Sequence, residues 1–290
     1  MSTSGFINVL KPAGMTSHDV VSFIRRTYGL KKVGHAGTLD PAAAGVLPIA
    51  LGSATRLIEY ITDADKGYRA ELTFGYKTDS GDDMGEVIEQ INNFKIPSQQ
   101  EIDTVLKPFT SRIQQVPPMY PAIKVNGQKL YELARQGKSI EVPTRLVEIS
   151  TIKMINNSGE KLLFDVTCSK GTYIRTLCMD IGAKLNLPAV MSFLIRTRVG
   201  KFTLQEAVTL EEIAADPQKA LQNVHSVLNF MPKVILTKEH SLAFSHGQII
   251  KIEQLIKNSV IAVYNENEKL IGIGSNVGQS LLKPVKVFNF

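Results

Sequence analysis

Residues 66–78 read KGYRAELTFGYKT, and over most of this segment apolar side chains alternate with polar ones. One set of alternate positions contains Tyr68, Ala70, Leu72 and Phe74. Because side chains of a β-strand point to opposite faces with a period of two, the segment predicts a strand with one buried face. A second alternating run, KLLFDVTC at residues 161–168, predicts another. Strands of this kind need a sheet to pair with, so a sheet is the framework around which the chain has to pack.

Helical patterns are interleaved with these strands. In TYIRTLCMDIGAKLN, residues 172–186, apolar side chains recur every three or four positions, which predicts a helix with Thr172 as a candidate N-cap. The segment SHDVVSFIRRTYG, residues 17–29, predicts a second helix with Ser17 or Asp19 near its cap. Strands and helices in this mixture predict an α+β fold.

The pattern of predicted secondary structure changes near Pro232. From there on, short apolar runs such as GQIIKI and SVIAVY alternate with turns, and no long helical pattern occurs. This predicts a small β-rich domain over residues 232–290, after a larger domain over residues 1–231. A length of 290 residues accommodates that division.

The stretch GHAGTLDPAAAG, residues 34–45, holds a single carboxylate, Asp40, among small residues. The twenty residues before it, 20–39, contain no acidic side chain. Aspartate followed by proline is a good helix start, with Asp40 as N-cap and Pro41 at the first helical position. The three glycines favour another interpretation, since glycine lets the backbone approach a ligand closely. Local sequence leaves both interpretations open.

Charge and cysteine content narrow the class of protein. The net charge of +6 is compatible with a polyanionic partner. Two cysteines cannot build a disulfide framework and indicate a reducing compartment, so we predict a cytoplasmic protein. No signal peptide or membrane span is evident. The five histidines show no paired ligand spacing and no CxxC occurs. The acidic segment DSGDDMGE, residues 79–86, lacks the alternating ligands of a calcium loop and predicts a solvated turn, so we predict no metal and no cofactor.

Six segments, in order, resemble the TruB family of pseudouridine synthases. The first two are GFINVLKPAGMTSHDVV and GHAGTLDPAAAGVL, of which the second is similar to the family's catalytic motif GHxGTLDPxAxGVL. The others are KGYRAELTFGYKTDSGDDMGEV, QVPPMYPAIKVNGQKLYELARQG, CSKGTYIRTLCMDIGAKL and SFLIRTRVGKF. Two positions depart from the family pattern, Ala44 in place of threonine and Ile195 in place of arginine. They concern RNA contacts rather than the reaction.

The resemblance implies the architecture in more detail. It implies a pseudouridine synthase catalytic domain over residues 1–231, with a central mixed, mainly antiparallel sheet and a thumb-like RNA-binding insertion near residues 120–147. It also implies a small PUA-like RNA-binding domain over residues 232–290. Between Lys124 and Arg145 the chain carries five basic residues against two acidic ones, which suits contact with RNA.

The activity implied by the resemblance is that of a tRNA pseudouridine-55 synthase, an isomerase that converts one uridine in the T loop of tRNA to pseudouridine. Uracil is detached from C1′ and rejoined through C5, with no redox change and no cosubstrate. The family's nucleophile matches Asp40. A carboxylate of this kind could attack C1′, as in retaining glycosidases, or add to C6 of the base. The sequence does not distinguish these routes.

The resemblance also assigns the residues around the nucleophile. Arg175 is expected to form an ion pair that keeps Asp40 charged in a dry pocket. Tyr68 is expected to lie against the target uracil and to help remove the C5 proton. The remaining substrate-binding residues are His35, Tyr173 and Leu194. Without the resemblance, an exposed helix charge, core side chains and a turn histidine would explain the same residues.

The expected partner is tRNA, held at its T stem-loop and acceptor arm, with the target base flipped out of its stack. We expect a monomer with no obligate protein partner. Two other functions compete: a tRNA-binding and folding protein without chemistry, and a synthase that acts on RNA chosen by a guide.

Overall fold

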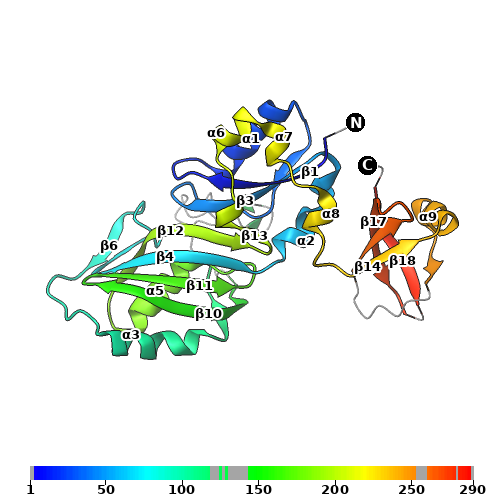
Figure 1. Cartoon of the computed structure of the whole chain (residues 1–290). Coiled ribbons are helices and arrows are strands. Elements are labelled where there is room, and N and C mark those ends of the chain that lie inside the picture. Colours follow the sequence, from blue (N-terminus) through cyan, green and yellow to red (C-terminus); the bar gives the residue numbers. More distant parts are fainter. Residues whose placement is uncertain are drawn as a thin grey trace.

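The computed structural model describes residues 3–117, 143–252, 260–278 and 280–288, and the backbone of 124–125 and 128–129. These residues form a nine-stranded sheet and a separate five-stranded sheet, joined by helices (Figure 1). No helix within these ranges is long and apolar enough to cross a membrane.

The large sheet confirms the predicted mixed, mainly antiparallel arrangement. Its strand order is β1 (Gly5–Lys11), β3 (Ala44–Leu51), β12 (Ala189–Val199), β4 (Lys66–Phe74), β11 (Lys161–Cys168), β10 (Arg145–Ser158) and β7 (Arg112–Gln115). Two short strands extend it, β2 (Val33–His35) beside β3 and β13 (Phe202–Thr203) beside β12. The contact of β12 with β3 is parallel, and the other strand pairs are antiparallel.

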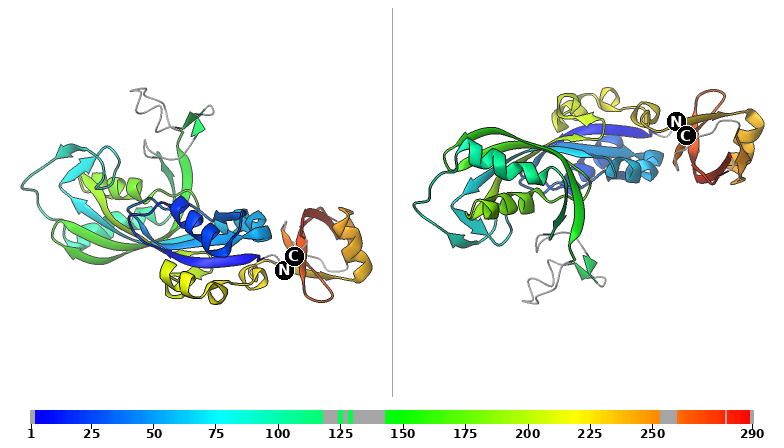
Figure 2. Two further views of the ribbon diagram at one scale, coloured as in Figure 1. Left: turned by 90° about the horizontal axis from the view of Figure 1, so that it is seen from above. Right: turned by 90° about the horizontal axis from the view of Figure 1, so that it is seen from below.

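The predicted alternation in β4 is present. Its four apolar alternate positions are buried, whereas Arg69 is exposed. The buried side chains join one apolar cluster with α3 (Gln99–Leu106) and α5 (Ile174–Lys184), which lie together along this part of the sheet (Figure 2). A second cluster packs α1 (Ser17–Tyr28) and α6 (Leu210–Ala215) against β1 and β3. The sheet therefore has a well-packed core on the side that carries α5.

Shorter elements connect these layers. They are η1 (Gly52–Leu57), α2 (Ile58–Thr62), β5 (Tyr76–Thr78), β6 (Val87–Gln90), η2 (Lys107–Phe109), η3 (Leu204–Glu206), α7 (Pro217–Ala220) and α8 (Val224–Val227). The strands β8 (Lys124–Val125) and β9 (Gln128–Lys129) pair with each other inside the predicted thumb-like insertion, most of which lies outside the described residues.

The predicted β-rich C-terminal part is confirmed. Its sheet has the order β14 (Lys233–Leu236), β16 (Ile261–Asn265), β17 (Leu270–Asn276), β18 (Leu281–Val287) and β15 (Ile250–Lys251), with helix α9 (Lys238–Ser245) packed on it. It docks at one end of the large part, beside α2 and α8 (Figure 1). Tyr264 and Phe288 enter an apolar cluster with Leu57 and Val227. Polar contacts add to this cluster, because Arg56 donates a hydrogen bond to the Val287 carbonyl at 2.6 Å.

Two predicted helix caps are wrong. Thr16, rather than Ser17 or Asp19, is the N-cap of α1, and Asp19 completes a capping box with it. Tyr173 is the N-cap of α5 without a side-chain bond, whereas the Thr172 hydroxyl donates to the Ser169 carbonyl at 3.0 Å. The hydroxyl of Ser17 is unavailable as a cap because it is bound to the segment that carries Asp40.

Candidate active site

Asp40 lies in a turn and does not begin a helix. The backbone N–H of Ala43 donates to the Asp40 carbonyl at 3.1 Å, and β3 starts at the next residue. The interpretation of Asp40 as a helix cap is therefore wrong. Pairing with β1 along all of β3 outweighs the local preference of the alanines for a helix. Gly45 has φ +113°, and a Cβ there would lie 2.3 Å from the Arg196 carbonyl oxygen, so the neighbouring strand requires glycine at this point.

Buried side chains hold the backbone of this turn. The Ser17 hydroxyl accepts from the Leu39 N–H at 2.8 Å and donates to the Leu39 carbonyl at 3.1 Å. The fully buried Lys11 donates from Nζ to the Pro41 carbonyl at 3.2 Å and to two further backbone carbonyls. Burial lowers the pKa of Lys11 to about 8. Residues on both sides of Asp40 are thus fixed by Ser17, which the sequence indicated only as a helix cap, and by Lys11, which it did not single out.

A second buried cation, Arg196 on β12, holds the other end of the turn. Its guanidinium donates to the carbonyls of Gly37 at 3.1 Å, Thr38 at 3.2 Å and Val46 at 2.7 Å. The one sequence feature that could have indicated Arg196 is its charge within a strand of mostly apolar residues. Nothing in the sequence indicates which carbonyls Arg196 binds.

Arg175 lies beside Asp40, as the resemblance implied. Its Nε is 3.4 Å from Asp40 Oδ2, and its Nη1 is 3.4 Å from Asp82 Oδ2. The Arg175 side chain is only 10% exposed, so the alternative of an exposed helix charge is wrong. The Asp40 side chain is 43% exposed, so the expected dry pocket is not present around it. One buried guanidinium is therefore shared by two carboxylates, and Asp40 is the one that faces solvent more.

Asp82 belongs to the acidic segment DSGDDMGE, which the sequence indicated to be a solvated turn. The Ser80 hydroxyl donates to Asp82 Oδ1 at 2.7 Å, and the Met84 N–H donates to the same oxygen at 3.1 Å. Ser80 also offers its carbonyl to Arg175 Nη1 at 3.2 Å. The segment is thus ordered against α5, and the interpretation of Asp82 as a merely solvated residue is wrong. Its partner is 93 residues away along the chain, so no local pattern could have identified it.

Tyr68 and Leu194 line the buried side of the site. Both are less than 10% exposed, and both join the apolar cluster that includes Leu39, next to Asp40. Burial raises the pKa of the Tyr68 hydroxyl, the Asp40 charge acts in the same direction, and the charge of Arg196 opposes them. The Tyr68 hydroxyl is therefore neutral at pH 7.

Tyr173 lies at the amino end of α5, half-buried. Its N–H donates to Gln115 Oε1 at 3.0 Å, and Gln115 Nε2 donates to its carbonyl at 3.3 Å. Burial raises the pKa of the Tyr173 hydroxyl, and the Asp40 charge adds to this shift. Gln115, which the sequence did not indicate, fixes Tyr173 relative to the end of β7.

His35 ends β2 and is half-buried. Burial lowers its pKa, and the charge of the nearby Arg196 lowers it further, so the imidazole is neutral at pH 7.

All six residues expected at the site thus lie around one turn. Together they offer a solvent-accessible carboxylate beside a fixed cation, next to aromatic and apolar walls. Among the described residues, no three His, Cys, Asp or Glu side chains are grouped to hold a metal ion.

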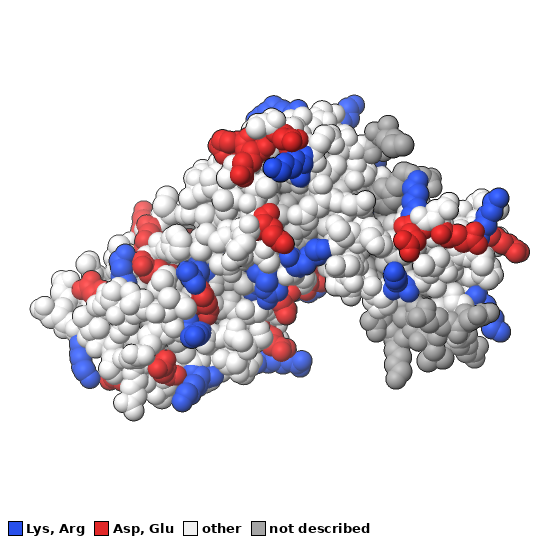
Figure 3. All heavy atoms as spheres, in the orientation of Figure 1, with Lys and Arg blue, Asp and Glu red and all other residues white. Residues whose placement is uncertain are grey.

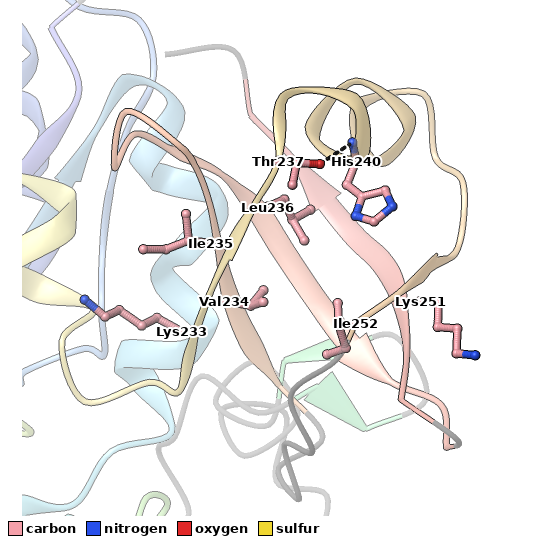
Figure 4. A pocket seen from close by; sticks show the side chains of 8 residues that line it. All are labelled: Lys233, Val234, Ile235, Leu236, Thr237, His240, Lys251 and Ile252. Atoms are coloured by element: carbon pink, nitrogen blue, oxygen red, sulfur yellow. Dashed lines mark hydrogen bonds between the residues drawn. The ribbon is translucent and has the colours of Figure 1, made fainter.

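The C-terminal sheet contains a separate hollow (Figure 4). Its apolar floor is formed by Val234, Leu236 and Ile252, whereas Lys233 and Lys251 point away from it on opposite sides. The polar lining there consists of Thr237 and His240 beside the two lysines, and no carboxylate lines the hollow among the described residues, so the Asp40 turn is the better candidate for chemistry. On the face drawn in Figure 3, basic and acidic side chains are interspersed rather than gathered in one patch.

Comparison with known families assigns almost the whole chain to one family. Residues 25–174 match the N-terminal domain of the TruB family pseudouridylate synthases. Residues 175–243 match a tRNA pseudouridylate synthase B C-terminal domain, and residues 232–288 match the C-terminal domain of pseudouridine synthase II TruB.

Similar proteins cover the chain almost completely. A protein of Caldanaerobacter subterraneus named tRNA pseudouridine synthase B is 46% identical over 99% of this chain and 100% of its own length. A protein of Bacillus subtilis with the same name is 41% identical over 98% of this chain and 97% of its own. Among solved structures, a Cbf5-Nop10-Gar1 complex aligns with TM-score 0.76 and 28% identity, over 99% of this chain and 84% of that chain. An H/ACA RNP bound to a substrate RNA aligns with TM-score 0.76, 26% identity and coverage of 99% and 85%.

Proposed function

Because the chain belongs to the TruB family of pseudouridine synthases, we propose that it converts the uridine at position 55, in the T loop of tRNA, to pseudouridine. One observation carries the proposal. The carboxylate of Asp40, in a segment similar to the family's catalytic motif, lies 3.4 Å from the buried Arg175 and is accessible to a substrate. The names of the similar proteins support tRNA as the substrate, and the T-loop position rests on the family resemblance.

In the proposed reaction an oxygen of Asp40 attacks either C1′ of the ribose or C6 of the uracil. On the C1′ route the bond between C1′ and N1 breaks as the bond to Asp40 forms, the base turns, and C5 then displaces the Asp40 oxygen from C1′. On the C6 route the base, still bound to Asp40, leaves C1′ through N1 and rejoins it through C5, and the bond between C6 and Asp40 breaks afterwards. In both routes C5 loses one proton and N1 gains one, so no electrons or cosubstrates are needed. The positive charge of Arg175, 3.4 Å away, attracts the Asp40 carboxylate before it attacks and after its bond to the substrate breaks. Since Asp40 is 43% exposed, we expect the bound RNA to exclude water from it.

The target base is proposed to leave the stack and to enter the space next to Tyr68, Tyr173 and Leu194. Flipping a base costs a few kcal/mol, and contacts with aromatic and apolar walls offset that cost. The neutral Tyr68 hydroxyl is proposed to face C5 and to help its proton leave. The neutral His35 is proposed to contact the RNA beside the flipped nucleotide by hydrogen bonding or stacking.

The rest of the chain is proposed to hold the tRNA. We assign residues 1–231 to catalysis, the insertion near residues 120–147 to the T arm, and the PUA-like residues 232–290 to the acceptor arm. We propose a monomer without an obligate protein partner, which also assists tRNA folding. The free, buried thiols of Cys168 and Cys178 support a reducing compartment such as the cytoplasm.

The test is to incubate the purified protein with unmodified tRNA alone and to map pseudouridine by mass spectrometry after cyanoethylation. We expect one new pseudouridine, at position 55. No product, together with tight tRNA binding and faster tRNA folding, would support the folding protein without chemistry. Product only after addition of a guide RNA and its proteins would support the guided synthase.

A further inference from the structure

Arg196 occupies a distinctive place in the sheet. Strand β12 lies between β3, which follows the Asp40 turn, and β4, which carries Tyr68. In the register of these strands, Arg196 stands opposite Gly45 on one side and opposite Tyr68 on the other. Residues directly opposite each other on antiparallel strands point to the same face of a sheet, so Arg196 and Tyr68 share a face. One side chain thus reaches both halves of the site.

The burial of Arg196 needs an explanation. It is 1% exposed and is the largest fully buried side chain among those described. Buried arginines are normally paired with a carboxylate, because an uncompensated buried charge is costly. Within the described ranges no acidic side chain lies within ion-pair distance of Arg196. Three of its hydrogen bonds go to backbone carbonyls, of which two, Gly37 and Thr38, belong to the turn before Asp40.

Arg196 interacts with Tyr68 through its charge and through a side-chain hydrogen bond to the Tyr68 hydroxyl. The charge of Arg196 lowers the pKa of the Tyr68 hydroxyl, although burial outweighs it, and the same hydroxyl favours the charged form of Arg196. The guanidinium is planar and its donors have fixed directions, so it can hold two carbonyls and a hydroxyl in one geometry. A lysine at this position would place a single ammonium among the same groups and could not hold them all.

We propose that Arg196 is a positioning residue for the proposed reaction. Its guanidinium fixes the Gly37–Thr38 backbone and the Tyr68 hydroxyl, so that Asp40 and Tyr68 both lie next to the same uracil ring. It does not touch the substrate. The inference rests on the proposed function. It adds an unassigned residue that links the nucleophile's turn to the tyrosine strand. A displacement of 1 Å at a reacting group can reduce a rate by about 10²-fold, so loss of this link should be visible in the chemical step.

The main experiment compares wild type with Arg196→Lys in single-turnover pseudouridine formation on a T-arm stem-loop at saturating protein. We expect the rate to fall about 10²-fold, with the Kd for the stem-loop within about 3-fold of wild type. The matched control is Arg198→Lys on the same strand, whose side chain donates to the Gly200 carbonyl and does not contact the turn. The control should keep the wild-type rate.

If Arg196 were purely structural, the Arg196→Lys substitution would lower the melting temperature. Its loss of rate would then multiply with the loss caused by any other substitution. We therefore combine Arg196→Lys with Tyr68→Phe. If Arg196 acts partly through Tyr68, the double variant should lose less rate than the product of the two single losses. Losses that multiply fully, or a wild-type rate in Arg196→Lys, would overturn the proposal.

If Arg196→Lys does not fold, Gly37→Ala tests the same link from the turn. Gly37 has φ +101°, and an added Cβ would lie 3.7 Å from Arg196 Nη1, so alanine strains the turn without a clash. We expect a rate loss of about 10-fold or more with RNA binding intact. A wild-type rate in this variant would overturn the proposal. Absence of pseudouridine with the wild-type protein would instead overturn the proposed function.

Discussion

Two arginine–aspartate pairs, one on each side of the large sheet, differ in their geometry and in their exposure to solvent. Arg69 and Asp165 form a two-pronged pair at 2.7 and 2.8 Å, with side chains 45% and 41% exposed. Arg175 meets Asp40 through a single contact at 3.4 Å, but its own side chain is 10% exposed. By geometry alone the first pair is the stronger.

The different exposure of the two pairs to water reverses their order in strength. Water and salt screen the exposed pair, so it contributes at most about 1 kcal/mol to stability. The Arg175 guanidinium is shielded, and it is divided between Asp40 and Asp82. The long contact leaves the Asp40 oxygens free for a substrate, whereas a short two-pronged pair would occupy both. A site residue is thus better recognised by the burial of its partner and by its unused oxygens than by the length of its hydrogen bond.

The largest effect that we predict within this comparison is that of Arg175→Met. The variant should form pseudouridine about 10³-fold more slowly, because a fixed cation next to the reacting group is removed. The measurement is single-turnover release of tritium from C5-labelled uridine in a T-arm stem-loop. A rate within 3-fold of wild type would show that the buried pair matters no more than the exposed one.

Lys11, the buried cation on the other side of the turn, gives a pH-dependent effect. Its pKa is about 8 in the folded protein against an ordinary 10.5, so between these values the unfolded chain binds more protons. The free energy of unfolding of wild type should therefore rise relative to that of Lys11→Met as the pH increases from 8 to 10.5, by up to about 3 kcal/mol.

Urea unfolding of both proteins at several pH values measures this difference. Parallel pH profiles would mean that Lys11 is not a buried cation in solution.

Asp82→Asn should have an intermediate effect. Without the second carboxylate, the Arg175 guanidinium is drawn closer to Asp40 and holds its oxygens more tightly. We expect a rate loss of about 30-fold, equivalent to about 2 kcal/mol, with the Kd for RNA nearly unchanged. The same tritium-release assay measures it. An unchanged rate would reduce Asp82 to a loop-ordering residue.

The smallest effect should be that of Arg69→Met, which breaks the exposed pair. We predict a change of at most about 1 kcal/mol in the free energy of unfolding and a wild-type rate of pseudouridine formation. Urea unfolding and the turnover assay measure both quantities. A loss of activity would mean that the exposed face of the sheet takes part in the reaction.

The sequence predicted the elements of the fold better than their caps and long-range contacts. The alternation of apolar and polar side chains in β4 could be recognised in the sequence because one face of that strand packs against a core. The alanines after Asp40 misled local reasoning, because pairing of β3 with β1 and β12 determines the conformation there. Asp82 and Arg196 could not be placed, since their partners lie far away in the chain and are in part backbone carbonyls.

The family resemblance supplied what local patterns could not. It placed Asp40, Arg175 and Tyr68, which are far apart in the sequence, in one site. The roles of these residues in the reaction stay predictions, and among the features that the resemblance implied, the dry pocket around Asp40 is not present.

The central claim is that the Asp40 carboxylate carries out the chemistry while the rest of the chain holds the RNA. Its most direct test is Asp40→Asn, which keeps the size of the side chain but removes its charge. We predict that the variant binds a T-arm stem-loop with a Kd within about 3-fold of wild type and forms pseudouridine at least about 10⁴-fold more slowly. Pseudouridine formed at the wild-type rate by this variant would contradict the account.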